Sequence, residues 1–159
     1  MSASDVKIRD IGEGLTLYET DEYDRLVEFF VKNQLEFDGD EEVDTDIVRC
    51  YKVTDAGDRL IGGAVLALRE GRFIIDGIAV DSAYRKEKIG EKMLEQVLSE
   101  VRSRGGQSLY LVARAPGFFR KNGFSAIAPD SAPNFFECKY CPQYMVSCHP
   151  EVMKYEFSR

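Results

Sequence analysis

The sequence predicts a single mixed α/β domain, in which a mostly antiparallel sheet is flanked by helices. Between residues 46 and 80, runs of β-branched and aromatic residues alternate with turn residues, which is typical of neighbouring antiparallel strands. The clearest amphipathic helix follows, and an apolar strand comes after it, so this strand–helix–strand unit predicts a parallel strand pair. The 159 residues contain no internal repeat and no low-complexity linker, and we expect one domain spanning residues 1–159.

The first part of the chain predicts one strand and one helix. Leu15–Tyr18 is interpreted as the first strand. Asp21 is a candidate N-cap, and the helix after it is expected to end near Gln34. Its apolar stripe has the i, i+3, i+4 spacing of a buried helix face and consists of Leu26, Val27, Phe29 and Phe30.

A series of strands and turns is expected next. DIVRCYKV, residues 46–53, predicts a strand, and the turn residues from Asp55 to Asp58 predict a hairpin into RLIGGAVLAL, residues 59–68. A second turn at Glu70-Gly71 leads into RFIIDGIAV, residues 72–80. This last run is almost continuously apolar, which favours a central strand that is covered on both faces.

The second half predicts a long helix followed by short elements. The helix ends at Gly105-Gly106, and QSLYLVA, residues 107–113, predicts a buried strand. A short helix is expected over Ala115–Asn122, and VMKYEF, residues 152–157, predicts the last strand. The apolar stripe of the long helix consists of Ile89, Met93, Leu94, Val97, Leu98 and Val101.

Charge and hydropathy exclude several classes of function. The net charge is −7, from 28 acidic and 21 basic residues, which argues against nucleic-acid binding because that needs clustered cations. No apolar run approaches the ~20 residues of a membrane span, and the first ten residues lack the apolar core of a secretory signal. We therefore expect a cytoplasmic protein. The densest acidic patch, Glu36 to Asp46, is interpreted as a solvated loop in preference to a wall that attracts an amine.

The strongest functional signal lies between the central strand, which ends at Val80, and the long helix, which begins near Ile89. Backbone N–H groups at a helix N-terminus lack intrahelical partners and lie at the positive end of the helix dipole, so they bind phosphate. Gly90 lets a ligand oxygen approach the backbone closely. The alternative is an ordinary basic first turn of a surface helix. The cations that would add positive charge here are Arg85, Lys86, Lys88 and Lys92.

Two motifs resemble those of the GCN5-related N-acetyltransferase (GNAT) superfamily. Residues Arg85–Gly90 (RKEKIG) are similar to its R/Q-x-x-G-x-G/A signature, which follows a strand and opens a long amphipathic helix. Residues Ala115–Phe124 (APGFFRKNGF) are similar to its A-x-x-F-Y-x-K-x-G-F element. The order of elements also matches from the first helix to the last strand, so the resemblance covers most of the chain and implies the GNAT fold.

The resemblance implies direct transfer of an acetyl group from acetyl-CoA, as co-substrate, to an amine. The pantetheine would lie along the end of the central strand, and the diphosphate would lie on the amides of the loop. The cofactor-binding residues that it implies are Ile78, Ala79, Val80, Arg85, Lys86, Glu87, Lys88, Ile89, Gly90, Glu91 and Phe119.

Two positions depart from the family pattern. Lys88 stands at the first glycine of the signature, so either its backbone is helical or the loop is altered. Phe119 stands at the tyrosine that protonates the departing thiolate, and phenylalanine cannot do so. A thiol with a pKa of ~8.5 is a tolerable leaving group without an acid, so the change weakens the mechanism without excluding it. Tyr144 or a water could also substitute.

Asp76 is the candidate general base that deprotonates the amine. It is an acid within an apolar strand, and burial would raise its pKa toward a useful value. Strand alternation predicts that it lies on the face shared by Ile74, Ile78 and Val80. The alternative is an aspartate at a strand irregularity beside Gly77, without a catalytic role.

Three cysteines, Cys138, Cys141 and Cys148, precede the single histidine, His149. Thiolates and imidazole are the usual ligands of structural zinc, and a C-x-x-C pair can also form a redox dithiol. Cys148 and His149 are adjacent and would normally point apart, so packing of reduced thiols is favoured over a zinc site.

The sequence thus predicts an acetyl-CoA-dependent N-acetyltransferase that acts on a primary amine of a small molecule or a peptide. Two alternatives stay open. One is an acyl-CoA-binding regulatory protein with impaired catalysis, which Lys88 and Phe119 favour, and the other is a thiol or metal module based on the cysteine-rich tail. Edge strands near the C-terminus could pair two copies into a homodimer.

Overall fold

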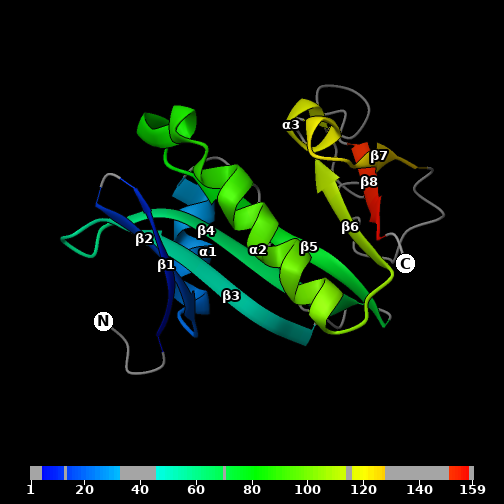
Figure 1. Cartoon of the computed structure of the whole chain (residues 1–159), viewed down its shortest axis with the longest axis horizontal. Helices are drawn as coiled ribbons and strands as arrows, with labels where there is room; N and C mark the ends of the chain where they lie inside the picture. Colours follow the sequence, from blue (N-terminus) through cyan, green and yellow to red (C-terminus); the bar gives the residue numbers. More distant parts are fainter. Residues whose placement is uncertain are drawn as a thin grey trace.

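The computed structural model describes residues 5–12, 14–32, 46–69, 71–113, 116–127 and 151–157. Within them, one eight-stranded sheet has the strand order β1-β2-β3-β4-β5-β6-β8-β7 (Figure 1). The strands are β1 Val6–Gly12, β2 Leu15–Thr20, β3 Asp46–Thr54, β4 Leu60–Arg69, β5 Arg72–Val80, β6 Ser108–Ala113, β7 Ser125–Ala126 and β8 Glu151–Glu156. The helices are α1 Tyr23–Lys32, the 3-10 helix η1 Ser82–Glu87, α2 Ile89–Ser103 and α3 Pro116–Lys121.

Neighbouring strands are antiparallel, with the exception of β5 and β6, which are parallel. The helix α2 lies between these two strands in the chain, as the strand–helix–strand unit in the sequence predicted. The predicted mixed, mostly antiparallel sheet with flanking helices is therefore confirmed.

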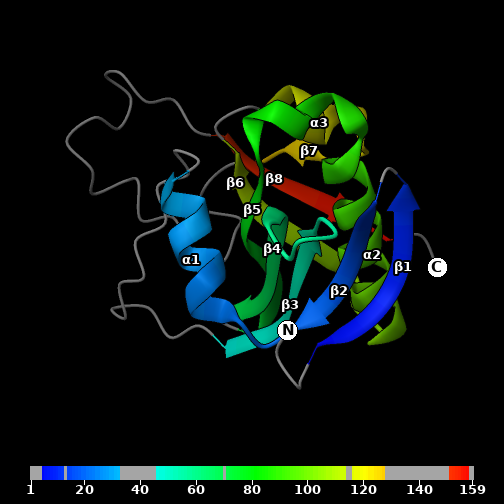
Figure 2. The ribbon, with the colours of Figure 1, turned by 90° about the vertical axis from the view of Figure 1, so that its left-hand side faces the viewer.

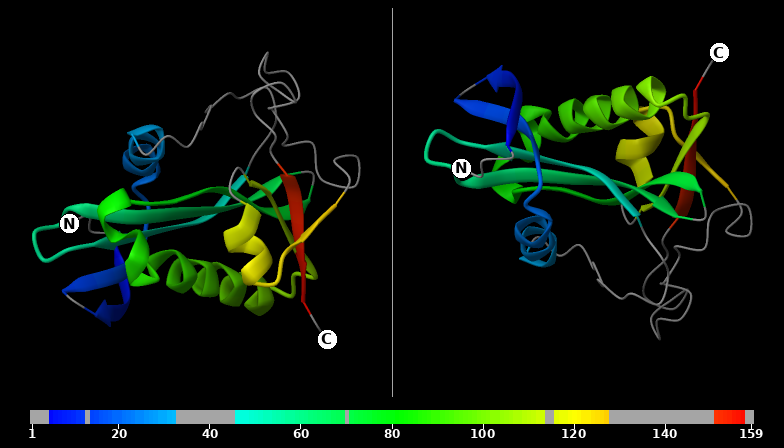
Figure 3. Two further views of the ribbon diagram at one scale, coloured as in Figure 1. Left: turned by 90° about the horizontal axis from the view of Figure 1, so that it is seen from above. Right: turned by 90° about the horizontal axis from the view of Figure 1, so that it is seen from below.

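The helices lie on opposite faces of the sheet, which we call the α1 face and the α2 face. Figure 2 and Figure 3 show α1 on one side of the sheet and α2 with α3 on the other. Two glycines allow α1 to pack closely. A Cβ at Gly63 would come within 2.5 Å of Leu26, and a Cβ at Gly77 would come within 2.5 Å of Phe30. The apolar side of α1 is therefore held directly against the central strands β4 and β5.

The larger part of the core lies on the α2 face. There the apolar stripe of α2 packs with residues of β2 to β6, and Leu98 of this stripe is partly buried. Full burial of one such side chain contributes about 1.5–3 kcal/mol, so this packing decides where α2 lies. The fully buried members of the stripe are Ile89, Met93, Leu94, Val97 and Val101.

Two strands were not predicted from the sequence. The sequence of β1 (VKIRDIG) has charged residues that interrupt its apolar pattern, and its pairing with β2 contains two register shifts. The side chains of Ile8 and Ile11 attach β1 to the core of the α2 face. The strand β7 has two residues, which is too short to give a pattern.

Several features that the sequence singled out lie outside the described residues. They include Tyr144 and the cysteines Cys138, Cys141 and Cys148, together with the acidic patch apart from Asp46, which begins β3. None of the helices in the described part of the chain is long and apolar enough to cross a membrane.

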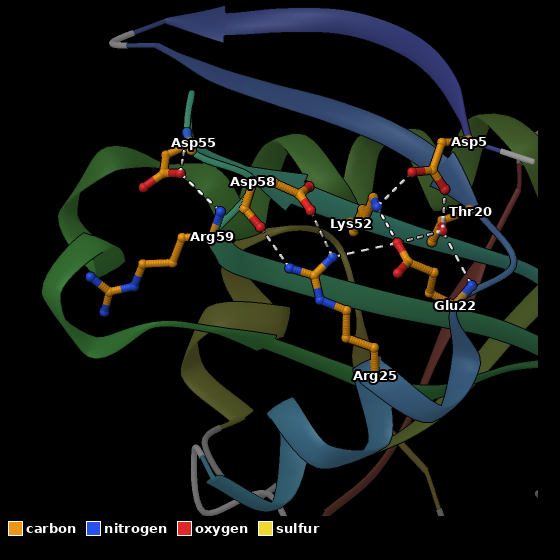
Figure 4. A network of polar contacts seen from close by, with 9 residues as sticks. Asp5, Thr20, Glu22, Arg25, Lys52, Asp55, Asp58 and Arg59 are labelled. Carbon is orange, nitrogen blue, oxygen red and sulfur yellow. Dashed lines mark hydrogen bonds and ion pairs between the residues drawn. The ribbon is translucent and has the colours of Figure 1, made fainter. Parts of the chain in front are cut away.

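A buried ion-pair network joins the segment before β1, the connection from β2 to α1, and β3 (Figure 4). Lys52 of β3 is fully buried, and its ammonium lies 2.6 Å from the Asp5 carboxylate and also contacts Glu22. Thr20 donates a hydrogen bond of 2.6 Å to Asp5 and accepts one of 3.2 Å from the Glu22 N–H. Burial lowers the pKa of Lys52, but the two carboxylates raise it more, so the ammonium stays charged.

Lys52→Met is expected to lower the free energy of unfolding by about 3–5 kcal/mol, because it leaves two carboxylates without their buried cation. Urea unfolding followed by circular dichroism measures this loss. Lys7→Met is the matched control, because the Lys7–Asp10 pair, 3.3 Å apart, is exposed. Removing such a pair costs about 0–1 kcal/mol. Equal losses in the two variants would show that the buried network does not hold the fold together.

Candidate active site

The parallel strands β5 and β6 are paired over only a short part of their length. The ladder joins two residue pairs, Phe73 with Leu109 and Ile74 with Tyr110. Both strands continue beyond this point, to Val80 and Ala113, and Figure 1 shows them diverging toward η1 and α3. In open sheets, ligands bind outside the carboxyl ends of parallel strands where the connections lead apart. The diverging ends of β5 and β6 are such a place.

The strand β5 also contains a bulge at Asp76. In the pairing with β4, Gly77 lies opposite Val65 and Ile75 lies opposite Leu66, so Asp76 is the extra residue. A bulge redirects the side chains of its strand. The irregularity considered for Asp76 and Gly77 is therefore present.

The bulge places Asp76 on the α1 face, and the prediction that it shares a face with Ile78 and Val80 is wrong. Ile78 and Val80 pack on the core of the α2 face. Asp76 instead acts electrostatically on Tyr23 and Cys50, which belong to the cluster beneath α1. Regular alternation predicts a shared face, but the extra residue reverses the alternation after position 76.

Asp76 is a buried acid beside Arg69 of β4. Its side chain is 11% exposed, and Nη2 of Arg69 lies 3.8 Å from its Oδ1. Burial raises the pKa of Asp76, and the Arg69 guanidinium partly opposes this rise. A carboxylate with a raised pKa is a stronger base than an exposed aspartate, which suits it to accept a proton at neutral pH.

The chain leaves β5 through a turn that is bonded to β4. The Asp81 N–H donates to the Ile61 carbonyl at 2.8 Å. The Asp81 side chain accepts a hydrogen bond of 2.9 Å from the Ala83 N–H, and Nη2 of Arg59 lies 3.3 Å from its Oδ2. These contacts fix the start of η1 relative to the central strands.

Lys88 joins η1 to α2 with φ 60° and ψ 22°, which is the left-handed conformation. Side chains disfavour this conformation and glycine does not. The backbone of Lys88 is therefore not right-handed helical, and it makes the turn that a glycine would make. The side chain of Lys88 is exposed.

The first turn of α2 lies against the end of β5 and against α3. A Cβ at Gly90 would be 3.3 Å from the Phe118 ring and 3.8 Å from Val80. Oε1 of Glu91 lies 4.0 Å from Nζ of Lys121. The N–H groups in the first turn of a helix have no intrahelical acceptor. Here they lie at the diverging ends of the parallel strands, where an anion can bind to them.

The other residues predicted for the cofactor site lie in η1, in α3 and further along α2. Arg85, Lys86 and Glu87 form the last part of η1. Phe119 is 8% exposed and lies in the core of the α2 face, with its ring 5.1 Å from that of Phe118. Nζ of Lys92 donates to the Ile11 carbonyl of β1 at 2.9 Å, so its ammonium is bonded to β1.

No group of three or more histidine, cysteine, aspartate or glutamate side chains that could hold a metal ion occurs among the described residues. Cys50 is buried and forms no disulfide. Because the three C-terminal cysteines are outside the described part of the chain, a zinc site there stays a prediction.

A family model described as "Acetyltransferase (GNAT) family" matches residues 16–124, which is more than half of the chain. The chain belongs to this family. The match begins in β2 and ends just after α3. The matched range therefore includes the bulge, the diverging strands and the first turn of α2. No curated protein matches the sequence.

Solved structures share the fold of this GNAT acetyltransferase. A GNAT-family acetyltransferase from Staphylococcus aureus has a TM-score of 0.69 and 18% identity, covering 91% of this chain and 99% of that chain. One from Elizabethkingia anophelis with acetyl-CoA bound has a TM-score of 0.60 and 15% identity, covering 92% and 100%. N-acetylglutamate synthase from Neisseria gonorrhoeae, complexed with coenzyme A and N-acetyl-glutamate, has a TM-score of 0.63 and 14% identity, covering 93% of this chain and 36% of that chain.

Sequence reasoning missed the residues that surround Asp76 in this GNAT acetyltransferase. Tyr23, Cys50 and Arg69 come from α1, β3 and β4, so no local spacing connects them with Asp76. The sequence gives one indication that Arg69 is unusual, because this charged residue directly follows the apolar run of residues 59–68. The contact of Phe118 with Gly90 has no such signal.

Lys88→Gly is expected to raise the free energy of unfolding by about 1 kcal/mol, because glycine adopts the left-handed conformation without a steric penalty. Thermal or urea unfolding measures the change. Glu95→Gly, at an exposed position in the middle of α2, is the matched control and is expected to lose about 0.5–1 kcal/mol. A loss of stability in Lys88→Gly would contradict the backbone conformation that we describe.

Proposed function

We propose that this protein is an acetyl-CoA-dependent N-acetyltransferase that acts on a primary amine of a small molecule or a peptide. Membership of the GNAT family supports acetyl transfer in general. Two structural neighbours support acetyl-CoA as the co-substrate, because one has acetyl-CoA bound and the other is complexed with coenzyme A.

The observation that carries the proposal is the position of the α2 N-terminus at the diverging ends of β5 and β6. A diphosphate needs several N–H donors and a positive field, and a helix N-terminus offers both. In the proposed complex, the pantetheine extends along β5 beyond Ile74, where the ladder to β6 has ended. The residues present therefore fit a ligand with an anionic end and an extended arm.

Each part of the site has a role in the proposed reaction. Bound acetyl-CoA supplies the activated acetyl group and a thiol leaving group with a pKa of ~8.5. Backbone N–H groups in the first turn of α2, which includes Gly90, would hold the diphosphate. A backbone N–H in the segment Ile78–Val80 polarises the thioester carbonyl, and such a preorganised donor typically contributes about 3–4 kcal/mol to catalysis.

Asp76 is the proposed general base. The amine must attack in its neutral form, and a lysine-like amine with a pKa of ~10.4 needs a base to reach it. Asp76 lies on β5, the strand that ends beside the first turn of α2, and its burial raises its pKa. An α-amine, with a pKa of ~7.7–8.0, depends on a base much less. The size of the effect of Asp76 therefore also reports on the class of amine.

Direct transfer is favoured over an acetylated cysteine. Cys50 lies near Asp76, but burial and the charge of Asp76 raise the pKa of its thiol to about 11. The thiol is therefore protonated at neutral pH, whereas the thiolate is the nucleophile. It is also 4% exposed, so a thioester cannot easily reach it.

An acyl-CoA-binding protein without catalysis is the alternative, and Phe119 favours it because its ring provides no acid for the departing thiolate. Both functions predict a higher melting temperature when acetyl-CoA is added, since a ligand that binds the native state stabilises it. Only the enzyme releases free coenzyme A thiol. A thiol-release assay with a panel of α-amines, lysine-like amines and peptides tests the proposal, and binding without release for every amine would favour the alternative.

Gly90→Glu is expected to abolish acetyl-CoA binding in isothermal titration calorimetry, because it places a negative side chain in the turn that holds the diphosphate. Circular dichroism checks that the fold is retained. Gly57→Glu introduces the same side chain in the β3–β4 hairpin, outside the proposed site, and should bind normally. Binding that survives in Gly90→Glu would place the cofactor elsewhere.

Asp76→Asn is expected to lower kcat at neutral pH by roughly 10²–10⁴-fold for a lysine-like amine, because the amide cannot accept a proton. The pH profile of kcat shows whether the ionised form of Asp76 is the active one. In the wild type, kcat rises with pH through the pKa of Asp76, and this acid limb should be absent in Asp76→Asn. Asp10→Asn, at an exposed position of β1, is the control and should keep the limb. Unchanged turnover in Asp76→Asn would remove Asp76 from the mechanism.

A further inference from the structure

Arg69 and Asp76 form a buried ion pair on the α1 face. Their side chains are 6% and 11% exposed. The side chains of Lys52 and Asp5 are also buried, and they belong to the network of Figure 4, which also contains Thr20. Arg69 instead lies beside the proposed base, so its charge is placed where it can affect the reaction.

The strand register explains how the pair meets. Arg69 lies opposite Arg72 across the β4–β5 turn, and cross-strand partners share a face. From Arg72, alternation along β5 brings Asp76 to the same face. The separation of 3.8 Å between Nη2 and Oδ1 exceeds a hydrogen bond, so this contact is mainly Coulombic.

The titratable groups that interact electrostatically with Asp76 come from α1, β3 and β4. Tyr23 of α1 and Cys50 of β3 have pKa values raised to about 12 and about 11, chiefly by burial, so both are neutral at neutral pH. Arg69 is the charged residue that acts on Asp76 itself. Asp24 acts electrostatically on Tyr23, and Asp21 acts on Cys50.

We propose that Arg69 is a positioning residue for the reaction, because its guanidinium keeps the Asp76 carboxylate ionised and on the α1 face, ready to accept the proton of the acceptor amine. This inference rests on the proposed function, with Asp76 as the base. Without Arg69, the buried carboxylate would lose its cation and would take up a proton instead. Arg69 would then set the lowest pH at which the enzyme works.

The test compares Arg69→Met, which removes the charge and keeps an aliphatic stem, with Arg69→Lys, which keeps a cation. A titration of the Asp76 carboxyl carbon by ¹³C NMR measures its protonation without any turnover. We expect the midpoint to rise by about 1–3 pH units in Arg69→Met and by less in Arg69→Lys. The acid limb of kcat should move by the same amount, while the Kd of acetyl-CoA stays unchanged. If Arg69→Met does not fold, Arg69→Gln gives the same comparison.

An unchanged midpoint in the uncharged variant would overturn the proposed role, even if the wild type acetylates an amine. An equal fall of kcat at every pH, with an unmoved acid limb, would also overturn it, since that is the result of a purely structural role. If the midpoint moves but the wild type transfers no acetyl group to any amine, the proposed function fails and the role in the reaction fails with it. The electrostatic control of Asp76 by Arg69 would still stand.

Discussion

The end of pairing between β5 and β6 after Ile74 is the constraint on which the candidate site depends. Parallel strands that stay paired satisfy each other's backbone groups and leave no room for a ligand between them. Here the two strands diverge, and α2, which connects them, begins where β5 ends. The turn proposed to bind phosphate and the end of β5 are therefore brought together by the topology of the sheet. The contact between Gly90 and Phe118 shows that this turn also packs against α3.

The bulge at Asp76 adds a second constraint, because it separates the two halves of the proposed reaction. Ile78 and Val80 face the core of the α2 face, whereas Asp76 faces Arg69 and α1. The close packing of α1 on Gly63 and Gly77 and the buried network around Lys52 hold the α1 face in place.

Local patterns in the sequence predicted most of the elements, because the periodicities of strands and of α2 are strong. The motif around Arg85–Gly90 also located the strand-to-helix turn, although only the structure shows that Lys88 adopts the left-handed conformation. The face of Ile78 and Val80 was predicted wrongly because that prediction assumed regular alternation, although Asp76 and Gly77 had indicated a possible irregularity at this point of β5. Arg69 could not be connected with Asp76, since their contact depends on strand register, which is a tertiary property.

The most direct test of the central claim is a ¹H–¹⁵N correlation NMR titration with coenzyme A, which reports on each backbone amide separately. If the diphosphate binds at the α2 N-terminus, the amides of residues 85–91 should show the largest saturable shifts, and those of residues 78–80 should follow them. Amides on the far side of the sheet, in β1 and β2, should barely change. Saturable shifts confined to other elements, or no shifts at millimolar coenzyme A, would contradict the account.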